Sequence, residues 1–176
     1  ETTTTTTRDR KSVVVTGSNS GIGLDGAAKL AARGYDVTLA CRTLAKAQAA
    51  KASIEATAAA NGVVLTGSLT PAECDLASLD SIRAFAASRR AAPLDALVLN
   101  AGVEFSGDNT VRRTADGFEI TVGVNHLGHF LLTNLLLPDL EAAASASPQS
   151  DGTTPRVVVT ASEVHDPASP GGNVGL

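Results

Sequence analysis

The sequence predicts an α/β fold in which helices cover both faces of a parallel β-sheet. Short apolar runs rich in Val and Leu alternate along the chain with longer helical segments rich in Ala. The runs are apolar at nearly every position, as strands buried on both faces of a sheet require. A glycine-rich turn follows the first run directly, at residues 17–23. Right-handed crossovers between such strands give a doubly wound sheet.

The first unit is a strand at Ser12–Thr16, a tight turn, and a helix at Gly21–Arg33 that Gly34 ends. The first glycine of the turn permits the sharp bend, the second lets the backbone approach a pyrophosphate, and the third lets the helix pack closely. The helix N-terminus offers unpaired N–H groups to phosphates. A purely structural turn is the alternative. We expect a dinucleotide diphosphate to bind at Gly17, Ser18, Asn19, Ser20, Gly21, Ile22 and Gly23.

Two further strand and helix pairs follow. A second strand is expected at Asp36–Cys41, and a second helix at Leu44–Ala60, where Asn-Gly ends it. The third strand lies within Val63–Cys74, although glycine and proline obscure its limits. Ser78 is expected to cap a third helix at Leu79–Arg90.

The remaining predicted elements complete a sheet of five strands. A fourth strand is expected at Leu94–Leu99, a long helix at Gly117–Leu137 with Pro138 near its end, and a fifth strand at Arg156–Thr160. The predicted parallel strand order is 3-2-1-4-5, which is a Rossmann-type arrangement.

The chain divides into one domain and two tails. Residues 1–10 read as a flexible Thr-rich tail, residues 11–165 as a dinucleotide-binding Rossmann domain, and residues 166–176 as a Pro/Gly-rich tail. A sheet that stops at its fifth strand is incomplete on its C-terminal side and exposes an edge. We therefore expect a protein partner or further residues to cover that edge.

Composition excludes several classes of function. A net charge of −4 with scattered arginines argues against nucleic-acid binding. No transmembrane span is expected, because the most apolar window, Phe130–Leu137, is interrupted and too short. Cys41 and Cys74 are expected as buried thiols in an intracellular, reducing compartment, and neither a disulfide nor a metal site is predicted. His126 and His129 are expected to pack or to lie on a helix surface.

The end of the second strand bears on the choice of cofactor. An acidic residue there would favour NAD by accepting hydrogen bonds from the ribose 2′-hydroxyl, but the sequence has Cys41 and Arg42. Arg42 can form a charge-assisted fork on a 2′-phosphate, and Lys46, one helical turn on, adds a second charge. The alternative is an exposed pair of cations with no ligand. We therefore expect NADP(H).

Five motifs in order resemble the short-chain dehydrogenase/reductase family over about residues 11–165. They are the glycine turn at residues 16–23, Asp75-Leu76, Asn100-Ala101-Gly102, Asn125 and Ser162. The resemblance implies that Asp75 contacts the adenine, although an Asp at this junction also suits a helix cap. It implies that Asn100, Ala101 and Gly102 hold the sheet near the cofactor, where a plain turn is the alternative.

The resemblance also implies catalytic roles and a reaction. Asn125 corresponds to the family's asparagine whose main-chain carbonyl holds a proton-relay water, and Ser162 to the serine that polarises the substrate. Hydride would pass between the nicotinamide and a carbonyl or double bond of a hydrophobic small molecule. Residues 115–119 and 124–132 look like the light-dependent protochlorophyllide reductase and retinol dehydrogenase-like branch, which makes the chloroplast one expected location. Leu99 departs from the reductases, which carry a cysteine there.

The family's catalytic Tyr-x-x-x-Lys motif is missing from this sequence. The single tyrosine, Tyr35, is followed four residues later by Leu39, and no lysine follows Lys51. Either the sequence belongs to a longer enzyme, or the chain is a catalytically inactive structural or regulatory subunit of a larger complex, such as a plastid one. A dinucleotide-binding redox sensor is a third interpretation.

Overall fold

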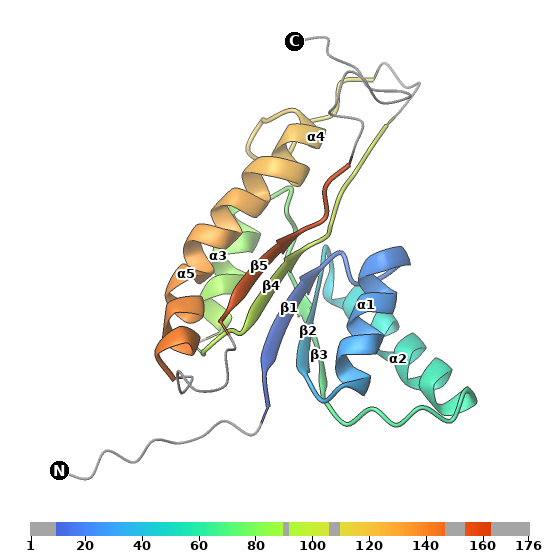
Figure 1. The fold of residues 1–176 in the computed structure, drawn as a ribbon. Coiled ribbons are helices and arrows are strands. Elements are labelled where there is room, and N and C mark those ends of the chain that lie inside the picture. The colour runs from blue at the N-terminus through green and yellow to red at the C-terminus, as the bar shows by residue number, and fades with distance from the viewer. Residues whose placement is uncertain (1–9, 90–91, 106–109, 147–153, 163–176) are drawn as a thin grey trace, which may run out of the picture.

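The computed structural model describes residues 10–89, 92–105, 110–146 and 154–162, so the tails expected at residues 1–10 and 166–176 lie outside this part, apart from Arg10. Five parallel strands form one sheet in the order β3-β2-β1-β4-β5. Helices lie on both sides of this sheet (Figure 1). The predicted doubly wound Rossmann-type α/β fold and its strand order are therefore confirmed.

The strands occupy the apolar runs. They are β1 Ser12–Thr16, β2 Asp36–Cys41, β3 Leu69–Glu73, β4 Ala96–Leu99 and β5 Arg156–Val159. Pro71 lies within β3 and pairs with Leu39. A proline is tolerated there because β3 is an edge strand, where one row of N–H groups has no ladder partner to lose.

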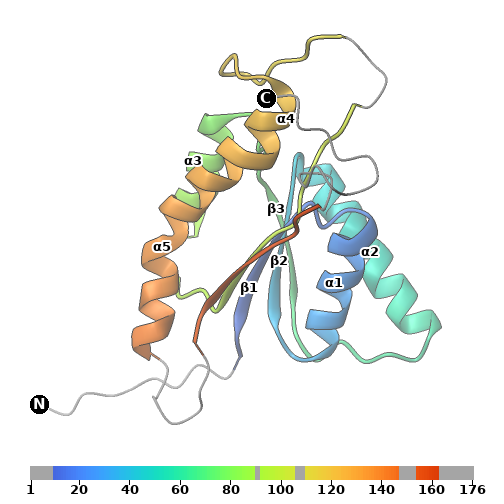
Figure 2. The same ribbon diagram turned by 45° about the horizontal axis from the view of Figure 1, so that its top comes forward.

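The helices separate onto the two faces of the sheet. They are α1 Gly21–Ala32, α2 Leu44–Ala60, α3 Leu79–Ser88, α4 Ile120–Val122, the π-helix η1 Gly123–Gly128, and α5 His129–Ala146. Figure 2 shows α1 and α2 on one side of the sheet and α3 and α5 on the other. The alternation of side chains along β1 follows this division. Val13 and Val15 pack with Ala27 and Ala31, whereas Val14 packs with Leu132.

The long helical segment differs from the prediction of a helix at Gly117–Leu137. It begins at Ile120, because the Glu119 carboxylate caps it by accepting the N–H groups of Thr121 and Val122 at 2.9 and 2.8 Å. It continues through Pro138 to Ala146. Although proline removes one helical hydrogen bond, the turns that follow it bury Leu140 and Ala143. Tertiary burial has therefore outweighed the local stop signal.

The same helical segment bears on membrane insertion. By length and composition alone the stretch Ile120–Ala146 could cross a membrane, although a core helix of a water-soluble protein passes the same test. The prediction of no span rested on a shorter apolar window. Leu132, Leu136 and Leu140 of this helix belong to the core cluster on one face of the sheet, and 33% of its most apolar window is buried in the fold.

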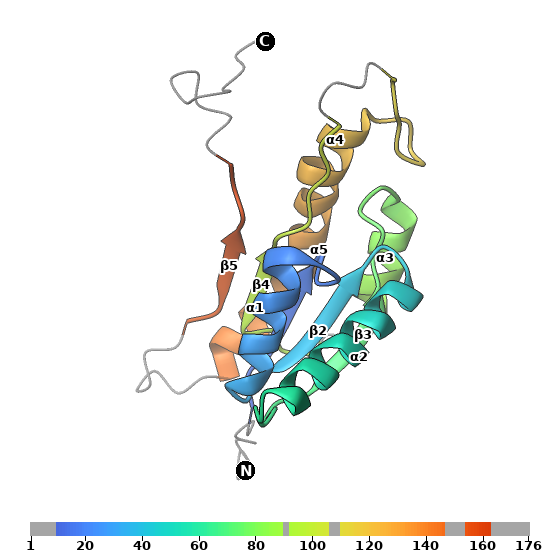
Figure 3. The same ribbon diagram turned by 90° about the vertical axis from the view of Figure 1, so that its right-hand side faces the viewer.

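The outer strand β5 is the most exposed part of the sheet. Figure 3 shows it at the edge, beside β4. Val157, Val158 and Val159 are 43%, 47% and 63% exposed. This strand therefore presents apolar side chains from both of its faces, in contrast to β1, whose residues Val13 and Val14 are fully buried.

Candidate functional site

A cavity of about 390 Å³ opens at the carboxyl ends of the strands. It lies where the strand order reverses between β1 and β4, which is the usual ligand position in doubly wound sheets. Ten residues singled out by the sequence line it: Gly17, Asn19, Ser20, Arg42, Lys46, Asp75, Leu76, Asn100, Ala101 and Gly102. Six others, all described, do not line it: Ser18, Gly21, Ile22, Gly23, Asn125 and Ser162.

The glycine turn is shaped by contacts that leave no room for side chains. Gly17 has a φ of +64°, and a Cβ there would lie 2.8 Å from the Cα of Ala101. A Cβ on Gly23 would overlap the main-chain oxygen of Gly17 and lie 2.5 Å from Nδ2 of Asn100. Glycine is therefore required at both positions, one for backbone conformation and both for close packing.

The N-terminus of α1 lacks the capping found on its neighbours. Its N-cap residue, Ser20, makes no side-chain capping hydrogen bond, and its first turn holds no acidic residue. In α2 and α3, by contrast, Thr43 and Ser78 accept the N–H groups of Lys46 and Ser81, each at 3.3 Å. The first turn of α1 therefore has no side-chain cap, and Ser20, which precedes it, lines the cavity.

Thr16 connects β1 to the segment after β4. Its buried Oγ1 accepts the N–H groups of Asn100 and Ala101 at 2.9 and 3.0 Å and lies 3.0 Å from Nε2 of His129. The Asn100 amide also donates to the main-chain oxygen of Thr16 at 3.1 Å. Thr16 was expected as the last strand residue and as the first residue of the glycine motif, and no contact with the segment after β4 was predicted. The sequence signal that could have indicated this role is a threonine at the end of a run of three valines.

Asn125 lies in the π-helix and bonds the segment that leaves β4. Its Oδ1 accepts the N–H of Val103 at 2.8 Å, and its Nδ2 donates to the Val103 carbonyl at 3.0 Å. Its main-chain oxygen faces Nδ1 of His129 at 3.2 Å. Ser162, by contrast, is exposed after β5 and is not brought to the cavity.

Asp75 takes part in a local turn at the strand-to-helix junction and also lies on the cavity wall. Its Oδ1 accepts the N–H of Ala77 at 3.0 Å, and its own N–H donates to Oγ of Ser81 at 2.9 Å. It also lines the cavity, with Leu76 beside it. The local turn therefore holds Asp75 in place at the cavity wall.

The two cysteines are free and buried, as expected. Burial, together with the nearby Asp75 and Cys41, raises the pKa of the Cys74 thiol to about 12. Burial also raises the pKa of Cys41, whose Sγ lies 3.4 Å from Oγ of Ser18. Both thiols are therefore protonated and poorly reactive at neutral pH. Among the described residues, no cluster of His, Cys, Asp and Glu could hold a metal.

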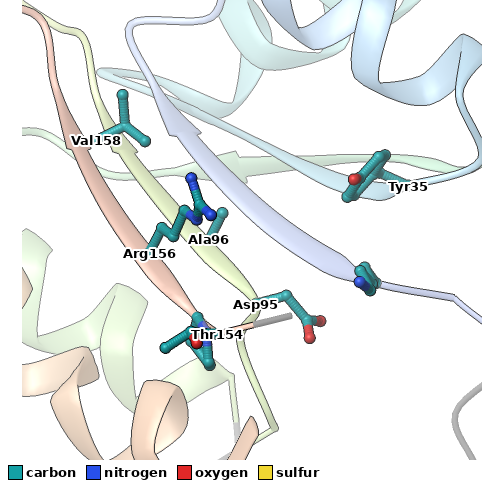
Figure 4. A pocket seen from close by; sticks show the side chains of 8 residues that line it. Tyr35, Asp95, Ala96, Thr154, Arg156 and Val158 are labelled. Carbon is teal, nitrogen blue, oxygen red and sulfur yellow. The ribbon is translucent and has the colours of Figure 1, made fainter. Parts of the chain in front are cut away.

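A second cavity, of about 330 Å³, lies at the opposite end of the sheet. Figure 4 shows Tyr35, Asp95 and Arg156 among its lining side chains. Tyr35 precedes β2 and Asp95 precedes β4, so both lie at the amino ends of parallel strands. Tyr35, the only tyrosine of the sequence, therefore lies at the opposite end of the sheet from the cavity that the glycine turn lines.

Known proteins resemble the chain over most of its length. Residues 11–172 match the short chain dehydrogenase family. Protochlorophyllide reductase of Chlamydomonas reinhardtii is 44% identical over 146 residues, which are 81% of this chain and 35% of that protein. Human retinol dehydrogenase 13 is 48% identical over 136 residues, which are 76% of this chain and 38% of that protein. The chain thus spans less than two fifths of these relatives.

A solved structure supports the same relationship. The crystal structure of a metagenomic short-chain oxidoreductase in complex with NADP is 29% identical and superposes with a TM-score of 0.64, covering 85% of this chain and 61% of that one. The sequence matches, the fold and the position of the cavity all indicate the same family. The chain belongs to the short-chain dehydrogenase family and resembles its protochlorophyllide reductase and retinol dehydrogenase branch.

Proposed function

We propose that this chain is the dinucleotide-binding part of an NADPH-dependent oxidoreductase. The observation that carries the proposal is the position of Arg42 and Lys46 on the wall of the cavity that the glycine turn also lines. The turn and the uncapped N-terminus of α1 suit a diphosphate. The two cations suit a 2′-phosphate. The carboxylate of Glu73 accepts the N–H of Leu44 at 3.2 Å and does not line the cavity, so it does not compete for the ribose.

The proposal assigns a role to each of the residues that the sequence singled out. Gly17 and Ser20 present backbone to the diphosphate, Asp75 and Leu76 flank the adenine, and Asn100 holds β4 against β1. Bound NADPH would supply the hydride. Asn125 supports the segment at Val103, and Ser162 polarises the substrate in the complete protein. No proton-donating role is assigned to Tyr35, because it lies in the other cavity.

We further propose that the complete protein reduces a carbonyl or double bond of a hydrophobic substrate such as protochlorophyllide, and that it works in the chloroplast. Similarity to chloroplastic protochlorophyllide reductases supports this choice. NADPH consumption with protochlorophyllide, measured in light and in darkness and compared with retinal, tests the substrate class. The family match gives no support to an inactive structural subunit.

The cofactor part of the proposal is tested by titration of the chain with NADPH and NADH, followed by fluorescence. Replacing Arg42 with Ala should weaken NADPH binding about tenfold or more, because a hydrogen bond to a charged group contributes roughly 1.5–3 kcal/mol. NADH binding should change little. Arg83→Ala removes the same charge from the exposed surface of α3 and should leave both affinities unchanged. Equal loss of NADPH affinity in both variants would contradict the role of Arg42.

A further inference from the structure

His129 is buried between the π-helix and the central strand of the sheet. Its side chain is 6% exposed, and its ring contacts one polar group on each side. Nε2 lies 3.0 Å from Oγ1 of Thr16, and Nδ1 lies 3.2 Å from the main-chain oxygen of Asn125. The ring thus joins η1 to the strand that leads into the glycine turn, across 113 residues of sequence.

These contacts determine which ring nitrogen carries hydrogen. A main-chain oxygen only accepts, so Nδ1 must carry the hydrogen and donate to Asn125. Burial lowers the pKa of His129, against the opposing effect of the Asn125 hydrogen bond, and so favours the neutral ring. In that tautomer Nε2 is an acceptor. The Thr16 hydroxyl must therefore donate its hydrogen to Nε2.

This direction of the Thr16 hydroxyl leaves both lone pairs of Oγ1 for the N–H groups of Asn100 and Ala101, at 2.9 and 3.0 Å. The other acceptor near this hydroxyl is the Val98 carbonyl, at the longer distance of 3.4 Å. A hydroxyl turned toward Val98 would set a lone pair of Oγ1 against the lone pair of Nε2. The lone pair of Nε2 therefore draws the hydroxyl hydrogen away from Val98 and fixes the direction of the hydroxyl, while Oγ1 accepts both N–H groups.

We propose that His129 is a positioning residue of the dinucleotide site, which acts through the Thr16 hydroxyl to hold Asn100 and Ala101 at the cavity wall. The inference rests on the proposed function, since it assigns a consequence for cofactor binding. Asn100 and Ala101 line the cavity. Ala101 is also the residue against which Gly17 packs without room for a Cβ. A shift of this segment would therefore deform the wall and the glycine turn together.

The experiment combines one measurement on the wild-type chain with a set of variants. ¹⁵N NMR of the imidazole nitrogens reports the tautomer of His129 directly. NADPH titration and amide hydrogen exchange at Asn100 and Ala101 are then compared across variants. His129→Phe removes both nitrogens, Thr16→Val removes the hydroxyl, and Thr16→Ser retains it. His126→Phe is the matched control, because His126 is an exposed residue of the π-helix that precedes His129, with its ring near Phe130.

The expected result is an unprotonated Nε2 in the wild type. His129→Phe and Thr16→Val should each weaken NADPH binding about three- to tenfold and speed exchange at both amides, and the double variant should be no worse than Thr16→Val alone. Thr16→Ser and His126→Phe should match the wild type. An Nε2–H tautomer, additive effects in the double variant, or wild-type exchange and affinity in His129→Phe would each overturn the inference.

Two safeguards keep the outcomes separate. If His129→Phe does not fold by circular dichroism, the contrast between Thr16→Val and Thr16→Ser decides the question, because only the hydroxyl differs in hydrogen bonding. If the wild-type chain does not bind NADPH, the proposed function fails. The tautomer and the amide exchange rates then still test the positioning role by themselves.

Discussion

Two buried polar side chains of α5, His129 and Asp139, are stabilised in opposite ways. His129 is kept neutral by burial, which lowers its pKa against the opposing effect of the hydrogen bond to Asn125. Asp139 instead pairs with the guanidinium of Arg89 at 3.1 Å, with side chains only 7% and 9% exposed. The neutral His129 ring is tested by a change of pH, and the Arg89–Asp139 ion pair is tested by substitution.

The lowered pKa of His129 predicts acid sensitivity. Between its folded pKa and the ordinary value of 6.5, the unfolded chain binds a proton that the folded chain does not. Stability therefore falls as pH drops below about 6.5 and this loss stops once pH passes the folded pKa. Urea unfolding at a series of pH values should show a smaller loss for His129→Phe than for wild type, whereas His126→Phe should follow the wild-type curve. Parallel curves for all three would contradict this.

The Arg89–Asp139 pair predicts a large effect from a single truncation. Asp139→Ala leaves a buried guanidinium without its partner, which costs about 3–5 kcal/mol. Asp25→Ala is the comparison, because it removes an exposed i,i+4 pair with Lys29 and should cost about 0.5 kcal/mol or less. The measurement is the free energy of unfolding in urea. A cost below about 1 kcal/mol for Asp139→Ala would show that the pair is not essential.

At the scale of elements, replacing a glycine of α1 with alanine should have an effect that depends on whether the glycine packs against the glycine turn. A Cβ at Gly23 would overlap the Gly17 carbonyl, whereas a Cβ at Gly26 would meet nothing within 4 Å. Both residues lie in α1. The same substitution should therefore have opposite signs at the two sites.

Gly23→Ala should destabilise the chain by roughly 1–3 kcal/mol through overpacking and should weaken NADPH binding. Gly26→Ala should stabilise it by roughly 0.5–1 kcal/mol, because alanine restricts the unfolded chain and favours the helix. Thermal unfolding and NADPH titration of both variants check this pair of outcomes. Equal shifts in melting temperature would mean that the turn can relax around a side chain.

The sequence predicts elements well where the pattern is local and less well where partners are distant. The apolar runs, the Asn-Gly stop after α2 and the Ser78 cap of α3 lie within or beside their elements, so these elements and the strand order could be predicted. The continuation of α5 through Pro138 depends on burial against other elements. The roles of Thr16 and His129 depend on each other across 113 residues. Rules that use only neighbouring residues cannot predict a contact over such a separation.

At the scale of the molecule, the sheet is asymmetric. Its β1 centre is buried by helices on both faces, whereas β5 exposes Val157, Val158 and Val159. Exposed apolar strands at an edge favour association. We therefore keep the proposal that further polypeptide, from the same protein or a partner, covers this strand in the cell.

This exposure predicts concentration-dependent association of the 176-residue chain. Replacing Val157 and Val159 with Lys should reduce association and dye binding to apolar surface, at a cost within about 0.5 kcal/mol per site. Val64→Lys makes the same change at a residue that is 73% exposed away from the sheet, and should have no such effect. Sedimentation velocity across a concentration series is the measurement. A wild-type chain that stays monomeric throughout would contradict the prediction.

The hydrogen bonds of the Thr16 side chain also bear on when the cavity wall can form during translation. The glycine turn leaves the ribosome early, but the N–H groups that Thr16 accepts are 84 and 85 residues further along the chain, and the ring that orients its hydroxyl is 113 residues further along. Until those residues emerge, the nascent turn lacks the wall that shapes it. We therefore expect the wall of this cavity to form only after His129 has been translated, so that a chain stalled earlier on the ribosome should not bind the proposed dinucleotide.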